Sequence, residues 1–338
     1  MTTPKFTLSR SKVFSQLDIV SECADIVAYS SKTNPLVTPL LESGSSCMFS
    51  IHLENELKNV KDKSRVLFFA QGWSASDVKR LVKLGIQWFV VDNESDLDVL
   101  LSVNVKVNLL LRVKLAEYSL KTEKYFVFGM DLKVVNSRIR EIRSRFEILG
   151  VHCHRKTQNM SEWNLIKEFG SILDSDVLEM IDIVNIGGGL PSEYVNTNTV
   201  VIDGILEKLK ELREWFNSKN IKMMVEPGRF IAAPVGKLIT NVIGMYDDNI
   251  IVNASVYNTD MDALIVPVKL LVEGELSRGA GVAYKIKGKT PCSMDLFRYR
   301  VYLKNVKVGS KIVFLNAGAY NFGSDFCDLG KLETEIVD

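Results

Sequence analysis

Several positions in the chain carry side chains, or lack them, in a pattern that could serve one reaction. Each follows or closes a short apolar run: Lys32, Arg112, His154, the glycines Gly187, Gly188 and Gly189, and Glu226 with Arg229. An amine can form a Schiff base, and glycine N–H groups together with a guanidinium can bind a phosphate. An imidazole can lie flat against a ring, and a carboxylate can bind a ring nitrogen. Together these are the groups that pyridoxal phosphate requires from a protein.

Taken one at a time, these residues have ordinary explanations. A lysine after a strand is usually a solvated loop residue, and the sequence EPGR at 226–229 is by itself a common turn. The histidines do not predict a metal site, because alternate strand residues face opposite ways and the chain has only His52, His152 and His154. The functional interpretation therefore depends on all of these positions meeting at one place.

Eight apolar runs supply the elements that would bring the positions together. They are DIVAY (25–29), CMFSI (47–51), RVLFFA (65–70), QWFVV (87–91), VNLLLRV (107–113), FEILGVHC (146–153), DIVNIG (182–187) and KMMVEP (222–227). Helix-prone stretches separate them, including 74–85, 94–103, 161–181 and 203–220. The alternation predicts a (β/α)8 TIM-like barrel over residues 20–233, with a doubly wound open sheet as the alternative. In such a barrel the working residues project from the carboxyl ends of the strands.

The sequence changes character after residue 233. The runs 237–246, 249–257, 263–274, 283–288, 297–303 and 310–320 are strand-like, are divided by Gly, Asp and Asn turns, and show little helical periodicity. They predict a C-terminal all-β domain, sandwich-like or barrel-like. The segment 1–19 has no place among the eight barrel units, so we assign it to this second domain, which then comprises 1–19 and 234–338.

The bulk composition excludes some partners. The 338 residues carry 42 Lys and Arg against 41 Asp and Glu, so no overall field would attract nucleic acid or an anionic membrane. The N-terminal stretch lacks the apolar core of a signal peptide, and no run approaches the length of a membrane span. Five scattered cysteines without a CxxC motif are typical of free thiols in a reducing compartment. We expect a cytoplasmic protein.

Six motifs, in the same order, resemble those of the fold type III pyridoxal-phosphate decarboxylases, the group of ornithine, diaminopimelate and arginine decarboxylases. They are YSSKTNP, GVHCHRKTQ, NIGGGLP, VEPGRF, TPCSMD and AGAYNF, and the resemblance extends over nearly the whole chain. It implies an alanine racemase-like barrel with a C-terminal β-domain, and pyridoxal phosphate as the cofactor. It also implies a homodimer whose active sites are shared between the subunits.

The resemblance gives a role to each matching residue. Lys32 would form the Schiff base with the cofactor, and Cys292 would act in the partner subunit's site to return a proton to the α-carbon. Glu226 would bind the pyridine nitrogen, and His154 would lie on the cofactor face. The phosphate contacts would come from Thr157, Gly187, Gly188, Gly189, Arg229 and Tyr320.

Glu226 favours decarboxylation over racemisation. The related alanine racemases are expected to place an arginine at the ring nitrogen, whereas a carboxylate keeps that nitrogen protonated and makes the ring a strong electron sink. We therefore predict an enzyme that removes the α-carboxylate of an amino acid. A racemase and a non-catalytic homologue that binds a regulatory partner are the alternatives, and the presence of both Lys32 and Cys292 argues against the non-catalytic one.

The resemblance is weakest where the far end of a substrate would bind. Ser293 follows Cys292 where diamine-type members carry an acidic residue, and Val266 stands where the family usually places an aspartate or an arginine. Since an unpaired buried ammonium is costly, ornithine would need a carboxylate from another position. The residues that could supply it are Asp260, Asp262 and Asp295.

The remaining candidates for contact with the substrate are few. We predict Tyr257, Ser293 and Asp295 as substrate-binding residues, and we expect Lys156 to point to solvent. The substrate is expected to be a small molecule, a diamino acid or a carboxylated polyamine, in polyamine or related amino-acid biosynthesis.

Overall fold

A computed structural model of the chain describes residues 2–114, 127–154, 165–197, 199–321 and 323–338. The chain forms two compact units. The first, which we call the barrel unit, consists of Gln16–Leu190 and Val200–Gly228. The second, which we call the sheet unit, consists of Met1–Ser15, Pro191–Thr199 and Arg229–Asp338.

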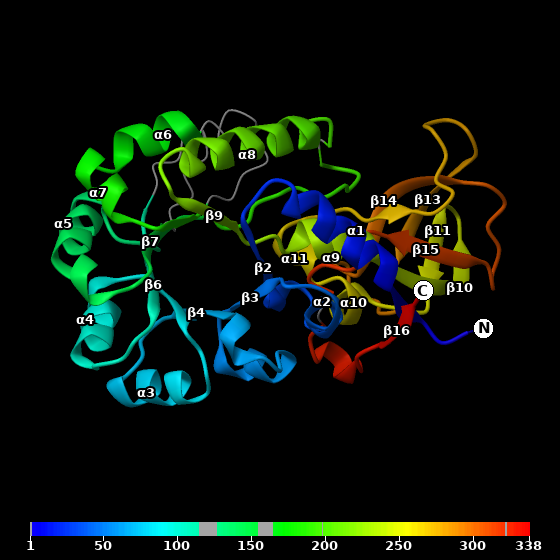
Figure 1. Ribbon diagram of the computed structural model, residues 1–338. Helices are drawn as coiled ribbons and strands as arrows, with labels where there is room; N and C mark the ends of the chain where they lie inside the picture. The colour runs from blue at the N-terminus through cyan, green and yellow to red at the C-terminus, as the bar shows by residue number, and fades with distance from the viewer. Residues whose placement is uncertain (1, 115–126, 155–164, 198, 322) are drawn as a thin grey trace. The chain divides into compact units, whose positions relative to one another are not determined.

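The barrel unit contains eight parallel strands that close on themselves, so the predicted barrel is confirmed and the open sheet is wrong (Figure 1). The strands are β2 (Ile26–Ser30), β3 (Met48–Ile51), β4 (Val66–Ala70), β5 (Trp88–Val91), β6 (Asn108–Arg112), β7 (Leu149–His152), β8 (Ile183–Asn185) and β9 (Lys222–Val225). All eight predicted runs become strands in the predicted order. The barrel closes where β2 pairs with β9, through Ile26 opposite Met224.

Helices join the strands and cover the outside of the barrel (Figure 1). They are α2 (Val37–Gly44), α3 (Ala75–Lys83), α4 (Glu94–Ser102), α5 (Leu132–Ile142), α6 (Leu165–Ile172), α7 (Ser175–Met180) and α8 (Ile202–Asn217), and α1 (Arg10–Ser21) precedes β2. Single 3-10 turns lie at η1 (Ser31–Thr33), η2 (Glu54–Asn59), η3 (Lys63–Arg65) and η4 (Arg143–Arg145). Local signals explain where helices begin: the Ser74 side chain accepts the Asp77 N–H in a capping box at α3. The stretch 161–181 is predicted as one helical region, but its described part, 165–181, contains two helices, because Asp174 has non-helical backbone angles.

The inside of the barrel is built in layers. An apolar layer is formed by Ala28, Leu67, Val90, Leu110, Ile183 and Met224, all buried. Because strand side chains alternate between two faces, the residue two positions further along each strand also points inward, toward the carboxyl end. These following residues are Ser30, Phe69, Asp92, Arg112, Asn185 and Glu226. The barrel interior therefore changes from apolar to polar within one layer.

The sheet unit is mostly β-structure. Its strands are β1 (Lys5–Ser9), β10 (Gly236–Tyr246), β11 (Asn249–Val252), β12 (Leu271–Val272), β13 (Val282–Lys287), β14 (Leu296–Leu303), β15 (Lys311–Leu315) and β16 (Glu333–Val337). They pair in the order β12-β15-β10-β11-β13-β14, and β1 joins β10 and β16. β1 comes from the N-terminal segment, and its Phe6 lies opposite Leu238 on β10.

Two predicted strand regions contain helical turns instead. α10 (Val256–Thr259) replaces the end of the run 249–257, and α11 (Asp262–Ile265) replaces the start of the run 263–274; α9 (Arg229–Val235) leads into β10. The reason at α10 is a capping box, in which the Ser255 and Asn258 side chains satisfy backbone N–H groups. β-branched residues alone therefore over-predicted strand in this segment, because a local cap outweighs their preference.

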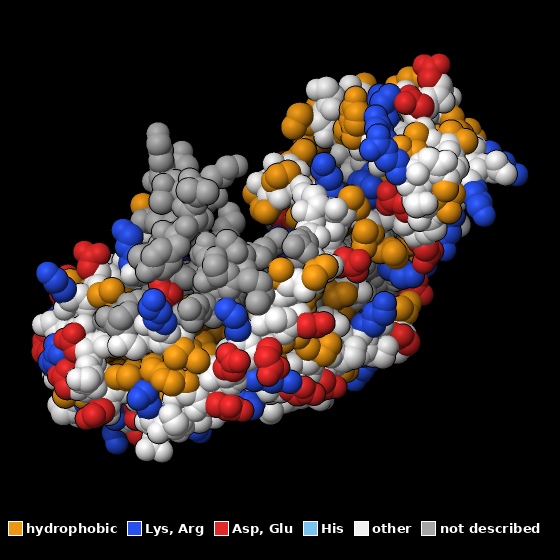
Figure 2. Space-filling view, turned by 90° about the horizontal axis from the view of Figure 1, so that it is seen from above, with side chains coloured by type: hydrophobic (Ala, Val, Ile, Leu, Met, Phe, Trp, Pro, Cys, Tyr) orange, Lys and Arg blue, Asp and Glu red, His pale blue; other side chains and the backbone are white. Residues whose placement is uncertain are grey.

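The surface carries both signs of charge. Basic and acidic side chains are interspersed over the face shown in Figure 2, in agreement with the nearly balanced counts of 42 and 41. In the described parts of the chain, no helix is long and apolar enough to cross a bilayer.

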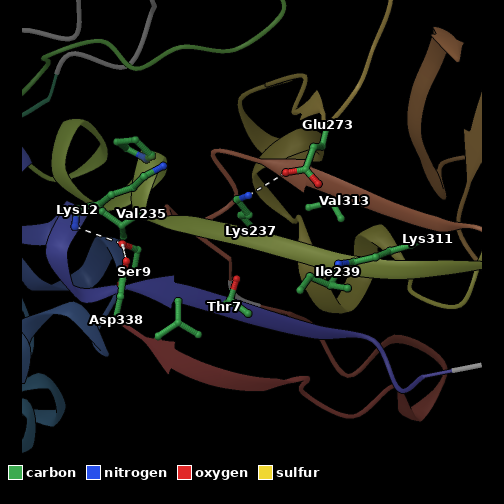
Figure 3. A pocket seen from close by; sticks show the side chains of 12 residues that line it. Thr7, Ser9, Lys12, Val235, Lys237, Ile239, Glu273, Lys311, Val313 and Asp338 are labelled. Atoms are coloured by element: carbon green, nitrogen blue, oxygen red, sulfur yellow. Dashed lines mark hydrogen bonds and ion pairs between the residues drawn. The ribbon is translucent and has the colours of Figure 1, made fainter.

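A groove of about 390 Å³ lies on the sheet unit, between β1, β10 and β15 (Figure 3). Its rim carries Lys237, which is paired with Glu273 at 2.9 Å, and Asp338, which accepts a hydrogen bond from Ser9. None of the predicted site residues lines it. The groove is therefore separate from the groups that carry the predicted chemistry.

Candidate active site

Lys32 stands on a short turn whose backbone is fixed on both sides. The Ser30 N–H donates to the Pro227 carbonyl at 3.3 Å, and the Ser31 and Thr38 hydroxyls are 2.9 Å apart. Asn34 is buried, and its side chain accepts the Leu36 N–H at 3.1 Å. In contrast with these buried neighbours, the Lys32 side chain is exposed. The small polar residues therefore hold the turn and leave the amine free to react.

His52, which follows β3, lies next to this amine. Its Nε2 is 3.3 Å from Lys32 Nζ, and its ring stacks on Phe69 with a centroid distance of 4.7 Å. Burial, followed by the positive charge of Lys32, lowers the pKa of His52 to about 3, so the imidazole is neutral at pH 7. The sequence analysis did not assign His52 to the site.

Glu226, at the carboxyl end of β9, is the centre of a buried network. Its carboxylate accepts hydrogen bonds from Ser50 at 2.8 Å and from Asn185 at 2.6 Å, and His152 Nε2 lies 3.2 Å from it. Burial by itself would raise the pKa of Glu226, but the hydrogen bonds and charge of its neighbours outweigh it and keep the pKa below its ordinary value. The site therefore holds an ionised carboxylate that is 7% exposed.

The glycine triplet after β8 is required by close packing. Gly187 and Gly189 have positive φ angles of 71° and 93°, which favour glycine. A Cβ on Gly188 would lie 2.6 Å from the Glu226 carbonyl oxygen, so no larger residue fits there. Among the described residues, Gly189 N–H has no acceptor, whereas Gly188 N–H donates to His154 Nδ1 at 3.2 Å.

His154 is held at the same barrel end by this bond from Gly188. Protein atoms packed around the ring lower its pKa to about 4, although part of its surface remains open to solvent. A neutral imidazole can lie against an aromatic ring without bringing a second positive charge next to Lys32. The geometry is compatible with the cofactor-face role predicted for it.

Arg112, at the end of β6, is paired with Asp92. The two side chains lie 3.1 Å apart, and the Arg112 guanidinium lies over the Phe128 ring at 4.9 Å. Asp92 Oδ1 also accepts the Gly129 N–H at 3.1 Å. Arg112 is therefore anchored at the carboxyl end of the barrel by a carboxylate that the sequence analysis did not consider.

In the sheet unit, Arg229 meets three side chains. It donates hydrogen bonds to Asp262 and, at 3.1 Å, to the Tyr194 hydroxyl, and its guanidinium lies 4.8 Å from the Tyr320 ring centroid. Arg229 and Tyr320, both predicted as phosphate contacts, are thus brought together. Tyr320 has a positive φ of 52°, a strained conformation for a non-glycine residue.

Cys292 and Tyr257, also in the sheet unit, form a close pair. The Tyr257 hydroxyl lies 2.9 Å from Cys292 Sγ, and the Tyr257 ring stacks on Phe326 at 4.1 Å. The hydrogen bond from Tyr257, with help from a backbone N–H of Met294, lowers the pKa of the Cys292 thiol. The predicted proton donor and one predicted substrate residue therefore share a hydrogen bond.

The other predicted substrate-binding residues differ in their exposure to solvent. Asp295 is 1% exposed, and its carboxylate accepts N–H groups of Val256 at 2.8 Å and Thr290 at 3.0 Å, so it anchors the loop that carries Cys292. Ser293 and Val266 are exposed. Lys156 and Thr157 lie outside the described residues.

Five polar residues of the site escaped the sequence analysis. They are Ser50, His52, Asp92, His152 and Asn185, and each lies in or just after the carboxyl end of a barrel strand. The usable signal was the two-residue period inside each strand, since the apolar layer predicts which following residues face inward. His52 and Asp92 directly follow β3 and β5 but received no role, whereas Ser50, His152 and Asn185 lie within their strands and are not among the residues that follow a strand. In the described residues, no group of three or more His, Cys, Asp or Glu side chains is arranged to hold a metal ion.

The chain is similar in sequence to diaminopimelate decarboxylases. The chain is 23% identical to the one from Pseudomonas fluorescens, over 99% of this chain and 88% of that relative. It is 25% identical to the one from Aquifex aeolicus over 76% of this chain, and spans 66% of that relative's length, just under two thirds.

Solved structures share the fold. The lysine/ornithine decarboxylase of Vibrio vulnificus, complexed with cadaverine, superposes with a TM-score of 0.82 at 18% identity, over 99% of this chain and 95% of the other. The Paramecium bursaria Chlorella virus arginine decarboxylase, bound to agmatine, gives 0.82 at 18% identity, over 100% and 96%. Residues 18–233 match the family described as the pyridoxal-binding domain of pyridoxal-dependent decarboxylases. The chain therefore belongs to the pyridoxal-dependent decarboxylase family, whose members use pyridoxal phosphate to decarboxylate amino acids.

Proposed function

We propose that this chain removes the α-carboxylate of a diamino acid or a carboxylated polyamine, with Lys32 as the amine that binds pyridoxal phosphate. The observation that carries the proposal is the buried, ionised Glu226 at the same barrel end as the exposed Lys32 amine. A carboxylate of this kind is what a protonated pyridine nitrogen needs as a partner. A racemase-type site would instead call for a weaker or positively charged partner at that nitrogen.

The residues present fit the cofactor. The Lys32 amine is accessible, the glycines leave no side chain beside the barrel end, and the Gly189 N–H has no acceptor among the described residues. Arg229 and Tyr320 add a cation and a hydroxyl in the sheet unit. When bound, pyridoxal phosphate supplies an electron sink for the pair of electrons left at Cα when CO2 departs.

The protein's own residues then have separate tasks. Glu226 holds a proton on the ring nitrogen, because it is kept ionised by Ser50, Asn185 and His152. The Cys292 thiol, activated by Tyr257, is proposed to return a proton to Cα. As in the family pattern, we propose a homodimer in which each subunit lends Cys292 to its partner's site.

The state of three acidic residues in the sheet unit favours a substrate other than ornithine. Asp262 is paired with Arg229, and Asp295 is occupied by backbone N–H groups. Burial, reinforced by the charge of Asp262, raises the pKa of Asp260 well above its ordinary value, so the charged form of this buried carboxyl is disfavoured. None of the three acids then offers a free charge for a distal ammonium. This favours a longer or differently anchored substrate, such as a carboxylated polyamine.

No disulfide bond joins the cysteines of the described residues, and Cys23, Cys47 and Cys153 are buried. We propose a reducing location such as the cytoplasm, where cysteines are usually kept as thiols.

The experiment is a substrate panel with the cofactor-loaded protein. Diamino acids and carboxylated polyamines are incubated with it, and both CO2 release and the amine product are measured. We expect release from at least one member, abolished in Lys32→Ala and unchanged in Lys61→Ala, an exposed lysine that bears no predicted function. Exchange of the Cα hydrogen with solvent without CO2 release would replace this proposal by the racemase alternative, and neither signal from any member would contradict catalysis.

A further inference from the structure

The barrel unit places a second histidine against the cofactor lysine. His52 Nε2 lies 3.3 Å from Lys32 Nζ, although the two residues come from the ends of different strands, β3 and β2. His154, the histidine with a predicted cofactor role, instead contacts the glycine triplet. The contact with Lys32 is therefore a feature that the cofactor contacts described above do not use.

The His52 ring is held in a defined orientation. Glu56 Oε1 accepts the backbone N–H groups of His52 at 3.0 Å and of Leu53 at 2.9 Å, which fixes the chain at this point. The ring lies nearly parallel to Phe69, with an angle of 7° between the planes, and the Phe69 ring meets the His152 ring at 81° with a centroid distance of 5.1 Å. A ring that only filled space would not need one nitrogen aimed at an amine. Here the stacking leaves Nε2 facing Lys32.

The second ring nitrogen has no competing role. His52 Nδ1 is buried and has no hydrogen-bond partner among the described residues. A neutral imidazole has one N–H and one lone pair, so Nε2 can accept from a Lys32 ammonium or donate to a Lys32 amine, depending on which nitrogen carries the hydrogen. One proton can thus be shared between the two side chains.

Lys32 needs such a partner. An ammonium has no lone pair, so it must lose a proton before its nitrogen can attack the carbonyl carbon of an aldehyde. We propose that His52 is the base that takes this proton from Lys32, an inference that rests on the proposed function of Lys32. The N–H bond breaks with its electrons left on Nζ, and the proton passes to Nε2. The free pair on Nζ would then be available to the cofactor's aldehyde carbon, and the two hydrogens left on Nζ would depart with the aldehyde oxygen as water.

The charges around His52 make the exchange sensitive to the state of Lys32. The charged and titratable groups around the ring are Lys32 on η1, Glu56 on η2, Arg112 at the end of β6, His152 at the end of β7 and Glu226 after β9. Burial is the largest cause of the low His52 pKa, and the positive charge of Lys32 lowers it further. As Lys32 gives up its proton that charge disappears, and the imidazole becomes a better base at the moment when it is needed.

The first test follows cofactor attachment rather than turnover. The apoprotein is mixed with pyridoxal phosphate from about pH 6 to pH 9, the attached cofactor is fixed with borohydride, and the labelled peptide is identified by mass spectrometry. In the wild type the proton can pass from Lys32 to His52 without leaving the pair, so the fraction with a neutral amine and a protonated imidazole should change little over this range. His52→Phe keeps an aromatic ring without a base, so its labelling rate should fall toward low pH, by up to about tenfold for each pH unit.

The cofactor's own titration affects the wild-type and variant rates equally, so dividing one rate by the other at each pH removes its effect. We expect this ratio to grow toward low pH for His52→Phe and also for His52→Gln, which can hold a hydrogen bond to Nζ but cannot carry the proton. A ratio that stays constant across the range would show that His52 only positions Lys32 and would overturn the proposal. Failure of the proposed function looks different, because the wild-type Lys32 peptide would then carry no label.

A second test needs no cofactor and leaves His52 in place. The chain has three histidines, so their ring signals can be assigned by substitution and titrated by NMR. Lys32→Ala should raise the His52 pKa above its wild-type value, whereas Lys61→Ala should leave it unchanged. An unchanged His52 pKa in Lys32→Ala would contradict the sharing of a proton, whatever the fate of the substitutions at His52.

Discussion

The Tyr257 hydroxyl lies 2.9 Å from the Cys292 sulfur, and this bond favours the thiolate. The pKa of Cys292 is lowered from its ordinary value of 9.0, first by Tyr257, and the pKa of Tyr257 is raised to about 12 by the same contact. When the Cys292 thiol is ionised, the protonated Tyr257 hydroxyl donates the hydrogen bond of the pair. Tyr257 therefore sets the acidity of the proposed proton donor.

We predict that Tyr257→Phe raises the pKa of the Cys292 thiol toward 9.0. The measurement is the rate of alkylation by iodoacetamide as a function of pH, with the Cys292 peptide quantified by mass spectrometry. Tyr299→Phe, an exposed tyrosine on β14, is the matched control and should leave the midpoint in place. The interpretation fails if both variants titrate like the wild type.

Glu226 should contribute to stability in a pH-dependent way. Its folded-state pKa is below the ordinary value of 4.5, so the stability it provides is complete above pH 4.5 and is lost as the pH falls through the folded-state pKa. Glu226→Gln should flatten the dependence of the unfolding free energy on pH in this acidic window, and Glu211→Gln, an exposed glutamate on α8, should not. Urea unfolding at several pH values between about 3 and 6 measures the slopes. Equal slopes for the two variants would count against a depressed pKa at Glu226.

The pair of Arg229 and Asp262 should be costly to break. Both side chains are largely buried, with 18% and 5% of their surfaces exposed, so Asp262→Asn leaves a guanidinium with little access to water. We expect a loss of about 3 to 5 kcal/mol in the unfolding free energy. Asp248→Asn removes the exposed partner of Lys285 and should cost less than about 1 kcal/mol. Similar losses from both variants in urea unfolding would show that burial does not distinguish the two pairs.

Gly150 should be irreplaceable in the barrel. A Cβ at this position would lie 2.1 Å from the Ile183 carbonyl oxygen on the neighbouring strand β8, so Gly150→Ala must push two hydrogen-bonded strands apart. We expect a loss of at least about 1 to 3 kcal/mol, as for other overpacked interiors. Gly170→Ala, on α6, meets no atom closer than 3.9 Å and should be neutral or stabilising. Thermal unfolding of the two variants tests the difference, and equal midpoints would contradict it.

Much of the architecture could be predicted from the chain alone. The eight strands appear in the predicted order, because each is a local run of β-branched and aromatic residues bounded by turn signals. Lys32 follows the first strand and Glu226 follows the eighth. Because the carboxyl ends of parallel barrel strands lie at one face, that order places both residues at the same end of the barrel. The helical turns α10 and α11 were not predicted, because their residues also favour strand; at α10 the capping box decides.

The partners of the functional groups were decided by the tertiary structure. Ser50 and Glu226 are 176 residues apart, and Asn185 and Glu226 are 41 apart, yet their side chains share one buried network. The sequence determined which side chains stand at the strand ends, because hydrophobic periodicity is a local property. It did not determine that His52 contacts Lys32 or that Asp262 forms an ion pair with Arg229. Those contacts depend on barrel closure and on the register and packing of segments far apart along the chain.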